Sequence, residues 1–563
     1  MNDKNSNRKT SVDTVDLIPL GGMGEIGKNL CIWETEDDAI VVDAGLAFPE
    51  EEMLGIDIVI PELDYLFSIR DKVSAVILTH GHEDHIGSLP YVLEQMTVPV
   101  YGPGLAMGLA KQKLEEFDLS LPAGSKTIKP REHIITDRFD VGFFRVSHSI
   151  ADAMGLTIRT PAGMMVHSGD FKLDHTPVNG EVTDFYTLAE VGDEGVRCLI
   201  CDSTNAERPG VTGSERLVGE HLQEIFRTAS GRILFTTFAS NIPRLQQVIE
   251  IADKNGRKVS VVGRSMRNSL EVSSEMGYVD VPEGVMVDID QLKRLPDDKV
   301  TILATGSQGE PYSALTLMSQ DRDRRMQIKQ GDTVVIAANP VPGNEKLVYR
   351  TVDNLSRLGA RVVYGSDSGV HVSGHASREE IKLMLNLTNP DNVIPVHGEY
   401  RHMKAFEELA QSMDIPDDSI YLLENGERLR FGSSGTRLAG SVESGQVMVD
   451  GLGVGDIGNV VLRDRERLSE HGIVLVVVCI DSDTGELVAN PEIITRGFVY
   501  VRESEQLLNV ARGKVKEVVA PAVNRGTTGR GELKNIIRDA LNNFIYERLQ
   551  RRPMVLPVIM DVS

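Results

Sequence analysis

The sequence predicts an α/β layered fold divided into about three domains. Short apolar runs alternate with amphipathic helical segments along residues 73–263, and strands that alternate with helices are typical of layered α/β folds. The 563 residues exceed the usual length of one domain, and 41% hydrophobic with 25% charged residues is an ordinary globular composition. A disordered chain, a collagen and a small disulfide-linked scaffold are therefore excluded.

The N-terminal part begins with consecutive strands and then changes to alternating strands and helices. Residues 15–60 hold three apolar runs separated by Gly-rich and acidic turns, which is the pattern of neighbouring strands. A buried strand, a helix, a short strand and a second helix follow. The expected strands cover 16–20, 29–33, 39–45, 73–80 and 99–102, and the expected helices cover 87–96 and 104–117.

The same alternation returns after Gly210 and changes character near Gly451. A helix at 214–229, a strand at 232–238, a helix at 242–256 and a strand at 258–263 predict a parallel βαβ unit. The Gly-rich segment that follows Gly451 is typical of a linker. Beyond it, a separate small α+β domain is expected, with strands at 472–481, 497–503 and 553–560 and helices at 506–523 and 531–550.

The formal net charge of −24 is distributed unevenly along the chain. Acidic residues outnumber basic ones in 1–210 and in 361–500, whereas 211–360 is close to neutral and 501–563 has a basic excess. A neutral block between two acidic blocks indicates an insertion into an acidic domain. The total charge argues against a polyanion bound over the outer surface.

Cysteine usage and hydropathy indicate a cytoplasmic protein without membrane contact. Four cysteines among 563 residues cannot form a disulfide framework and fit a reducing compartment. The apolar runs fall short of the roughly 20 residues needed to cross a bilayer. Residues 1–14 are polar throughout, so we expect a disordered tail rather than a signal peptide.

A cluster of potential metal ligands follows the strand expected at 73–80. The segment His80-Gly81-His82-Glu83-Asp84-His85 offers imidazole nitrogens and carboxylate oxygens, which are the ligands that zinc prefers. A loop that leaves a buried strand can direct alternate side chains toward one point, and Gly81 permits the turn. A single histidine is ordinarily a structural residue, but chance is a poor explanation for four potential ligands within six residues. The motif therefore predicts a metal site.

Three more residues of ligand type end apolar strands elsewhere in the chain. His148 follows FFRVS, Asp170 ends MMVHSGD and His397 follows NVIPV. Each alone is an ordinary residue, but together they supply the ligands that the first motif lacks. His167, three residues before Asp170, is expected to be a packed strand histidine.

The order of H-x-H-x-D-H, a lone His, a lone Asp and a late His resembles the metallo-β-lactamase superfamily, whose fold is an αββα sandwich with a two-metal site. Asp43 in VVDAG matches the early Asp of that superfamily, which orients ligands. The resemblance implies two zinc ions, held by His80, His82 and His148 on one side and by Asp84, His85 and His397 on the other, with Asp170 bridging them.

Further motifs resemble the beta-CASP nucleases, namely CDST at 201–204, HVSGH at 371–375 and the late His397. In that family an inserted domain covers the metal site and nucleic acid lies between the domains. GGMGEIGKN, DAGLAFPEEEMLGID, LTHGHEDHIGSLPY and PEIITRGFVYVRES together resemble the bacterial ribonuclease J family from about residue 15 to the C-terminus. The implied division is 15–210 and 366–450 for the metallo-β-lactamase domain, 211–365 for the beta-CASP domain, 451–465 for a linker and 466–563 for a C-terminal α+β domain.

The resemblance implies a zinc-dependent ribonuclease that hydrolyses phosphodiesters with a metal-activated hydroxide and leaves a 5′-phosphate. Asp84 and Asp170 are expected to ligate metal and orient that hydroxide. His375 is the candidate general acid or oxyanion stabiliser for the departing 3′-oxygen, with Asp202 positioning it. The family also implies 5′→3′ exonuclease activity that prefers a 5′-monophosphate, together with endonuclease cuts, in messenger decay and ribosomal RNA maturation.

Several turns could bind RNA phosphates through main-chain N–H groups and helix N-termini. Each one alone is equally well explained as an ordinary cap or turn. The resemblance implies a pocket for a 5′-monophosphate near the HVSGH motif. The candidate residues are Ser240, Asn241, Arg264, Ser265, Ser307, His371, Ser373, Gly374 and His375.

RNA, further copies of the chain in a homodimer or homotetramer, and RNA-decay proteins are the expected partners. Mn²⁺ or Mg²⁺ could replace Zn²⁺ during turnover. Two alternatives stay open, a beta-CASP DNA nuclease and a non-catalytic RNA-binding subunit. Because bound cations would offset the acidity of the site, RNA is expected in a confined metal-bearing channel rather than on the outer surface.

Overall fold

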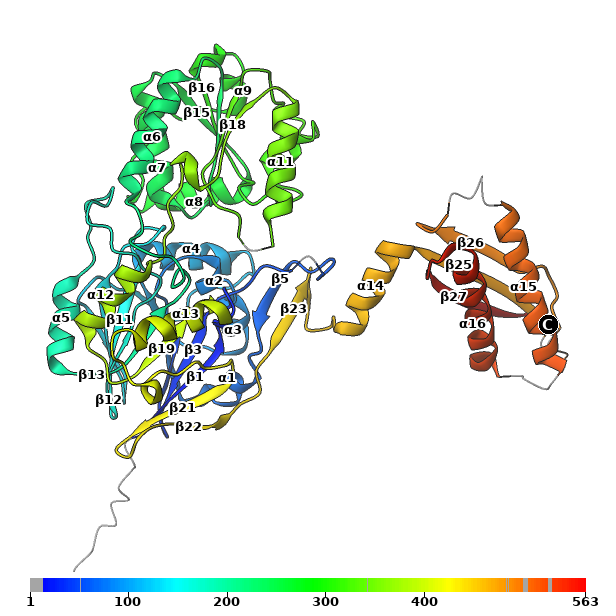
Figure 1. Ribbon diagram of the computed structural model, residues 1–563, viewed down its shortest axis with the longest axis horizontal. Coiled ribbons are helices and arrows are strands. Elements are labelled where there is room, and N and C mark those ends of the chain that lie inside the picture. Colours follow the sequence, from blue (N-terminus) through cyan, green and yellow to red (C-terminus); the bar gives the residue numbers. More distant parts are fainter. Residues whose placement is uncertain are drawn as a thin grey trace, which may run out of the picture. The chain divides into compact units, whose positions relative to one another are not determined.

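A computed structural model describes residues 14–50, 52–341, 343–481, 484, 486–499, 505–524 and 529–562 (Figure 1). The chain divides into two compact units. The first contains Ile58–Val447 together with the residues up to Phe48, and the second contains Pro49–Asp57 together with the residues from Met448 on. The second unit therefore takes in a short segment that the sequence assigned to the first domain. The domain bounds expected from the sequence stay predictions.

The first unit contains a sandwich of two sheets, as the predicted fold class requires. Trp33 and Ile77 of one sheet share a buried core with Phe143 and Ile200 of the other. The larger sheet has the order β22 (Gly435–Ser441), β21 (Glu427–Gly432), β1 (Val15–Gly21), β3 (Leu30–Glu34), β4 (Ala39–Val42), β6 (Val73–Ile77), β7 (Val100–Gly102) and β8 (Lys126–Thr127). The smaller has the order β19 (Val393–Val396), β13 (Val196–Asp202), β12 (Gly163–His167), β11 (Met154–Thr160), β10 (Asp140–Arg145) and β9 (His133–Ile135).

Helices cover the outer faces of this sandwich. Successive residues of a strand point to opposite faces, so Ile200 faces the other sheet while Leu199 packs with the helices outside. The helices are α1 (Asp64–Ser68), α2 (Glu83–Ile86), α3 (Leu89–Gln95), α4 (Gly104–Glu115), α5 (Phe185–Glu194), α12 (Arg378–Thr388) and α13 (Tyr400–Gln411). The unit also contains the short strands β2 (Met23–Gly24), β20 (Gly398–Glu399) and β5 (Ile58–Pro61).

A parallel α/β layer lies between β13 and β19 in the chain, which is the insertion that the charge pattern indicated. Phe235 packs toward α6 and α7, whereas the neighbouring Leu234 packs toward α10 and α11. The sheet has the order β15 (Lys258–Val262), β16 (Val300–Ala304), β14 (Ile233–Thr236), β17 (Thr333–Ile336) and β18 (Arg361–Val363). Its helices are α6 (Glu215–Thr228), α7 (Ile242–Lys254), α8 (Arg264–Glu275), α9 (Ile289–Leu292), α10 (Ala314–Ser319) and α11 (Glu345–Arg357).

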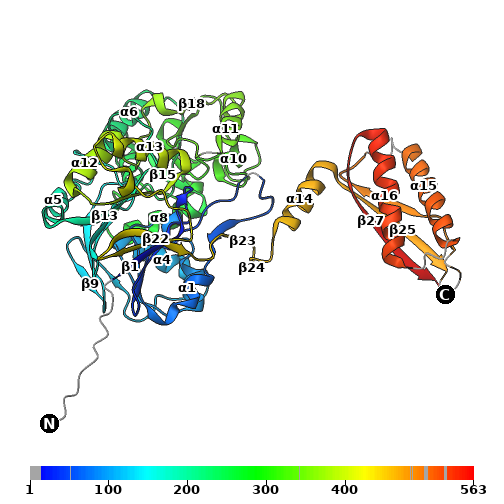
Figure 2. The same cartoon turned by 60° about the horizontal axis from the view of Figure 1, so that its bottom comes forward.

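The second unit holds a small α+β fold in which α15 and α16 cover one face of a three-stranded sheet (Figure 2). Val474, Val476 and Val478 point toward these helices and form the core with them. The sheet order is β26 (Glu492–Arg496), β25 (Ile473–Asp481) and β27 (Met554–Val562), and the helices are α15 (Glu505–Asn524) and α16 (Arg530–Leu549). β23 (Gln446–Asp450), β24 (Gly453–Val454) and α14 (Asn459–His471) precede this sheet.

The secondary structure of this region differs from the expected one at two places. The segment 451–465, expected to be a linker, includes the first half of α14. That helix buries none of its residues, so it lacks the apolar stripe that predicts a helix. A strand was expected at 497–503, but the structure has the strand β26 just before this segment. Residues 497–499 are not in a strand, and 500–503 lie outside the described residues.

Candidate metal centre

The predicted ligands meet at one edge of the sandwich, where strands of both sheets end. β6 leads into the H-x-H-x-D-H segment, β10 precedes His148, β12 precedes Asp170 and β19 precedes His397. The motif is not a loop throughout, because Asp84 and His85 lie in the short helix α2, which begins at Glu83 and has His82 as its N-cap. The carboxyl ends of strands therefore bring together side chains that lie more than 300 residues apart, such as Asp84 and His397, whose separation is 313.

Three histidines form the first half of the site. The Nδ1 atom of His82 lies 3.0 Å from Nε2 of His80 and 3.1 Å from Nε2 of His148. The Oδ2 atom of Asp170 is 3.8 Å from the Nε2 atoms of both His80 and His148. Two nitrogens that are each about 2.05 Å from a tetrahedral ion lie about 3.3 Å apart, so this spacing suits a shared cation.

A carboxylate-rich group forms the second half, and Asp170 belongs to both. Oδ2 of Asp170 lies 3.2 Å from Nε2 of His85 and 3.5 Å from Nδ1 of His397. Nε2 of His397 lies 3.0 Å from Oδ2 of Asp84. The ligand atoms within each half lie within 4.8 Å of one another, so the structure brings together all seven residues that the sequence predicted.

Hydrogen bonds on the far side of the rings orient these histidines. Nδ1 of His85 lies 2.7 Å from Oδ2 of Asp43, and Nδ1 of His148 lies 2.9 Å from the Gly374 carbonyl. Nδ1 of His397 lies 3.0 Å from Oγ1 of Thr204. Oxygens of Asp43 and Gly374 accept the Nδ1 protons of His85 and His148, which directs Nε2 of both rings toward the centre. Nδ1 of His397 also lies 3.5 Å from Oδ2 of Asp170, so Thr204 positions that ring without assigning its tautomer.

Electrostatics separate the two halves. Burial, together with the neighbouring histidines, lowers the pKa of His80 and His148 well below its ordinary value and lowers the pKa of His82 to about 4. Burial also opposes charge on His85, but the carboxylates of Asp170, Asp43 and Asp84 outweigh it and raise the pKa of His85 well above its ordinary value. The first half is thus a set of neutral imidazoles, and the second a carboxylate-rich pocket.

The residues present fit a divalent metal. The neutral imidazoles of His80, His82 and His148 and the ionised Asp170 carboxylate have the protonation states in which these side chains bind a metal, and His85 would release its extra proton when a metal binds. Burial raises the pKa of Asp170, but the histidines around it outweigh burial and hold that pKa well below its ordinary value. A buried carboxylate among converging nitrogen lone pairs is a cation site by the chemistry of its donors.

A further acid–base pair adjoins this centre. Nδ1 of His375 lies 2.7 Å from Oδ2 of the buried Asp202, and the His375 ring lies 4.9 Å from the ring of His148. Burial opposes charge on His375, yet Asp202, Asp170 and Asp84 raise its pKa to about 9. The structure therefore joins the two residues that the sequence paired for proton transfer. Asp202, His375 and His397 also form a third group of ligand-type atoms.

The candidate RNA-binding residues occupy two places. Ser240 and Asn241, Arg264 and Ser265, and Ser307 follow β14, β15 and β16, so they lie at one edge of the parallel sheet of the insertion. His371, Ser373 and Gly374 lie in the segment that returns from the insertion to the sandwich. Asn241 is also an ordinary N-cap, since its side chain accepts a hydrogen bond from the Arg244 N–H of α7.

Gly374 occupies a position where only glycine fits. A Cβ atom there would lie 2.8 Å from Cε1 and Nδ1 of His148. The close approach lets the Gly374 carbonyl accept the His148 proton. His167 behaves as expected, because it is buried in β12 and its Nδ1 accepts the Gly169 N–H.

Sequence reasoning missed three residues that organise the site. The Thr79 N–H and hydroxyl both donate to Asp43, at 2.8 Å each, and Thr204 supports His397. Both threonines lie inside motifs that were recognised, Thr79 in LTHGHEDHIGSLPY and Thr204 in CDST, so those motifs were a usable signal. Arg244 contacts His371, and the sequence reasoning assigned it no role, because a cation in the first turn of a helix is ordinarily exposed.

An αββα sandwich with an α/β insertion, two adjoining His/Asp groups and a nearby His–Asp pair defines a metallo-hydrolase of the beta-CASP type. Sequence comparison agrees. The matching family descriptions are "Metallo-beta-lactamase superfamily" over 30–187, "Ribonuclease J, beta-CASP domain" over 230–355, "Zn-dependent metallo-hydrolase RNA specificity domain" over 360–418 and "Ribonuclease J C-terminal domain" over 460–562.

Relatives that match over nearly the full length of the chain show which family it belongs to. The chain is 44% identical to Ribonuclease J2 of Bacillus subtilis over 99% of its own length and 100% of that protein. It is 44% identical to Ribonuclease J of Thermus thermophilus, over 98% of this chain and 96% of the relative. The chain belongs to the ribonuclease J family. A crystal structure of a protein of unknown function from Enterococcus faecalis shares the fold, with a TM-score of 0.53 and 18% identity over 74% of this chain and 99% of the other.

Proposed function

We propose that the protein is a zinc-dependent ribonuclease that hydrolyses RNA phosphodiesters, digests RNA from a 5′-monophosphate end and also cuts internally. The observation that supports this best is the shared carboxylate of Asp170, which joins two ligand groups beside the His375–Asp202 pair. Membership of the ribonuclease J family gives RNA as the substrate class.

Two zinc ions are the proposed cofactors, with Mn²⁺ or Mg²⁺ as possible replacements during turnover. One would be held by His80, His82 and His148, the other by Asp84, His85 and His397, and Asp170 would be common to both. When bound, divalent cations lower the pKa of a water molecule and offset the charge of the scissile phosphate.

The chain's own residues supply proton transfer and orientation. His375 donates its Nδ1 proton to Asp202, which leaves Nε2 to give a proton to the departing 3′-oxygen. Asp43 and the Gly374 carbonyl orient the rings of His85 and His148, and Thr204 positions the ring of His397. Asp84 lies beside His397 and is proposed to orient the attacking nucleophile.

The 5′ end of the RNA is proposed to bind between the turn residues of the insertion and the 371–375 segment. Ser240, Asn241, Arg264, Ser265 and Ser307 share one edge of the insertion sheet, where backbone N–H groups at helix starts suit a phosphate. His371 and Ser373 are proposed to complete the pocket. Such a pocket would favour 5′→3′ digestion because it fixes the end of the substrate relative to the metal centre.

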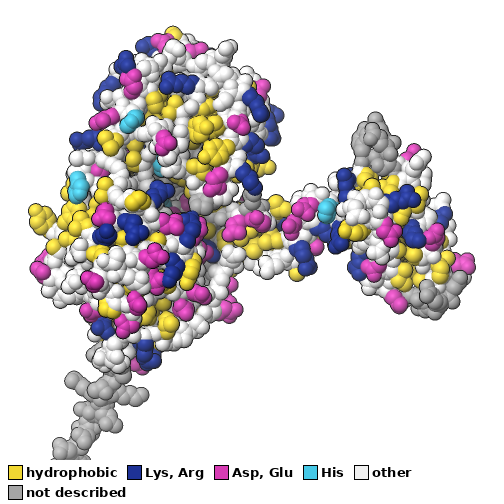
Figure 3. Space-filling model, in the orientation of Figure 1, with side chains coloured by type: hydrophobic (Ala, Val, Ile, Leu, Met, Phe, Trp, Pro, Cys, Tyr) yellow, Lys and Arg dark blue, Asp and Glu magenta, His cyan; other side chains and the backbone are white. Residues whose placement is uncertain are grey.

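The surface and the cysteines support the remaining proposals. On the face shown in Figure 3, Lys and Arg are interspersed with Asp and Glu, which agrees with RNA bound in a confined site rather than across the outside. All four cysteines are free, which suits action in the cytoplasm on messenger and ribosomal RNA. No helix of the described residues is long and apolar enough to cross a membrane. Assembly into a homodimer or homotetramer, and contact with RNA-decay proteins, are proposed from the family.

The test compares the wild type with His82→Ala on matched RNAs that carry a 5′-monophosphate, a 5′-triphosphate or a 5′-hydroxyl, and on DNA of the same sequence. We expect metal binding and RNA cleavage in the wild type, with 5′-monophosphate RNA degraded fastest, and loss of both in the variant. His133→Ala is the control, because His133 is an exposed histidine paired with Asp140. Equal cleavage of DNA, or unchanged activity in His82→Ala, would contradict the proposal.

A further inference from the structure

Arg244 is a fully buried cation in the insertion. It lies in the first turn of α7, has 0% exposure, and its backbone N–H donates to the Asn241 side chain. Its Nε and Nη2 atoms donate to Oε1 of Glu215 at 2.9 and 2.5 Å, and Nη2 also donates to Oε2 at 2.9 Å. Glu215 is 6% exposed, so this is a buried, bidentate ion pair between α6 and α7.

The remaining donors of Arg244 face the segment that returns to the metal centre. Nη1 donates to the Ala337 carbonyl at 2.6 Å and to Nδ1 of His371 at 2.9 Å, and Nη2 reaches the Val372 carbonyl at 3.5 Å. All five N–H groups of the guanidinium therefore have an acceptor. A lysine at this position could serve at most three of these contacts and none of them as a planar pair.

The contact with His371 determines where the imidazole carries its proton. Arginine has no acceptor, so Nδ1 of His371 must accept and cannot bear a hydrogen. The proton of the neutral ring then resides on Nε2, at the edge of the ring turned away from Arg244. Burial and the cations Arg244, Arg208 and Lys172 lower the pKa of His371 to about 3, against a hydrogen bond with the backbone of Ala337.

We propose that Arg244 is a positioning residue that holds His371 as the neutral tautomer protonated at Nε2, so that the 5′-phosphate pocket presents a permanent, uncharged hydrogen-bond donor. The proposal rests on the proposed function, in which His371 contacts the 5′-phosphate. A donor that never titrates offers the 5′-phosphate the same uncharged hydrogen bond at every pH at which the enzyme works, whereas a free histidine changes charge near neutrality.

Arg244 also links two of the candidate RNA-binding segments. Its backbone belongs to the turn capped by Asn241, and its side chain holds His371 and Val372. Two residues further on, Gly374 supports His148 of the metal centre. One side chain therefore fixes the start of α7 relative to a segment that contacts a metal ligand.

The first experiment uses the wild-type protein and needs no substitution. Long-range ¹H–¹⁵N spectra distinguish the protonated from the unprotonated nitrogen of an imidazole. Among the 13 histidines, His371 is assigned by the signal that His371→Asn removes. We expect a proton on Nε2 and none on Nδ1 from pH 6 to 8. A protonated Nδ1, or titration of the ring within this range, would overturn the proposal.

The second experiment measures kcat/KM for 5′-monophosphate RNA relative to 5′-hydroxyl RNA, a ratio in which the pH dependence of the chemical step cancels. We expect Arg244→Met to lower this ratio tenfold or more at pH 8 and to make it rise as the pH falls to 6, because His371 then gains a proton. The wild-type ratio should follow only the titration of the 5′-phosphate itself, whose second pKa is about 6.

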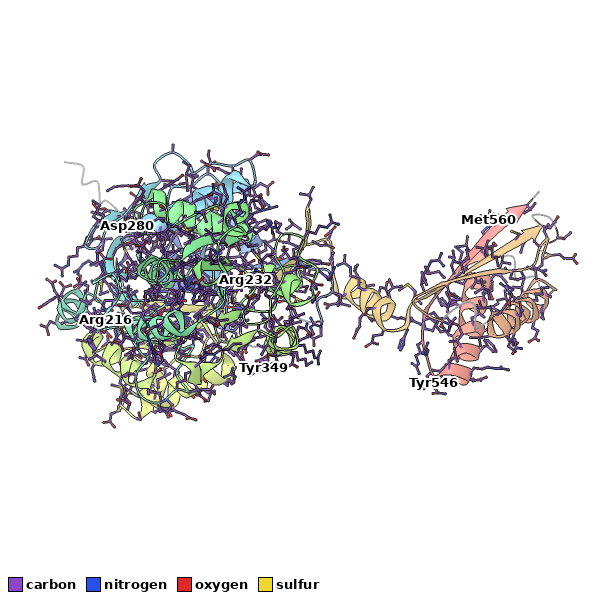
Figure 4. The ribbon with its side chains drawn as sticks, turned by 90° about the horizontal axis from the view of Figure 1, so that it is seen from above. Arg216, Arg232, Asp280, Tyr349, Tyr546 and Met560 are labelled. Carbon is purple, nitrogen blue, oxygen red and sulfur yellow. The ribbon has the colours of Figure 1, made fainter. Side chains whose placement is uncertain are left out.

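Arg232→Met is the matched control (Arg232 is labelled in Figure 4). Arg232 forms a buried bidentate pair with Asp332 in the same insertion, before β14 and β17, at the opposite ends of these strands from α7. The Arg232→Met variant should keep the wild-type ratio and its wild-type pH dependence. If Arg244→Met behaves like Arg232→Met, the positioning role is refuted. If the wild type itself does not prefer a 5′-monophosphate, the proposed function fails instead, whatever tautomer the spectra show.

Discussion

Asp43→Asn tests how the protein orients a metal ligand without touching the metal. The Asp43 carboxylate accepts three hydrogen bonds, from the Thr79 N–H and hydroxyl at 2.8 Å each and from Nδ1 of His85 at 2.7 Å. Asp43 has a left-handed backbone, with φ of 62°. Asparagine tolerates that conformation, so the substitution changes one oxygen to an amide without straining the chain.

Neither orientation of the new amide satisfies its surroundings. With its NH₂ toward His85, the amide would need Nδ1 as an acceptor, which moves the histidine proton to Nε2, the atom that faces Asp170. With its NH₂ toward the Thr79 N–H, two buried donors face each other, at a cost of about 1–3 kcal/mol. We therefore expect metal affinity to fall by about 10- to 100-fold, the usual effect of losing a partner that orients a metal-binding histidine.

The assay is a competition titration of zinc against a chromophoric chelator, together with RNA cleavage at saturating metal. Asp38→Asn is the matched control, because Asp38 is buried in the same unit and accepts hydrogen bonds from the Ser74 and Thr136 hydroxyls and the Arg138 N–H. Both variants should lose some stability, but only Asp43→Asn should lose metal affinity. Wild-type affinity in Asp43→Asn would refute the idea that Asp43 sets the His85 tautomer.

Three further outcomes are expected. Gly374→Ala should lower kcat well below the wild-type value in a steady-state RNA assay, because the new Cβ would lie 2.8 Å from the His148 ring, and unchanged kcat would contradict the assigned contact. Arg232→Met should lower the free energy of unfolding by about 3–5 kcal/mol in urea titrations, because the Asp332 carboxylate then stays buried without its partner. At pH 8 a thiol reagent should label Cys479 first. Burial raises the pKa of the other three cysteines, that of Cys31 to about 12, so their reactive thiolates are scarce until the protein unfolds.

The sequence was sufficient to predict that the candidate ligands lie close together, because they sit at the ends of apolar strands. His148, Asp170 and His397 each follow a run of buried residues, and strand ends in a layered α/β fold meet at an edge. The alternation of apolar runs with helical segments likewise predicted the inserted α/β layer. Local sequence patterns were enough to predict which residues lie together wherever those residues follow strands whose carboxyl ends meet at one edge of the fold.

Features that depend on distant partners could not be predicted from local patterns. The Arg244 charge is stabilised by Glu215, whose position 29 residues away in the chain is seen only once α6 packs on α7. The polar helix α14 gave no apolar period, and its Arg465 is held by Asp450 and the Leu54 carbonyl. In each case the deciding interaction is tertiary.

The ligand set spans the chain from His80 to His397, with the whole insertion synthesised between them. A ribosome-bound chain whose synthesis has not passed His397 therefore lacks a member of the carboxylate-rich group, and before residue 374 it also lacks the carbonyl that orients His148. The nuclease centre is completed late in translation. An unfinished chain, held close to its own messenger by the ribosome, is thereby kept from having a complete set of metal ligands while that messenger is still being read.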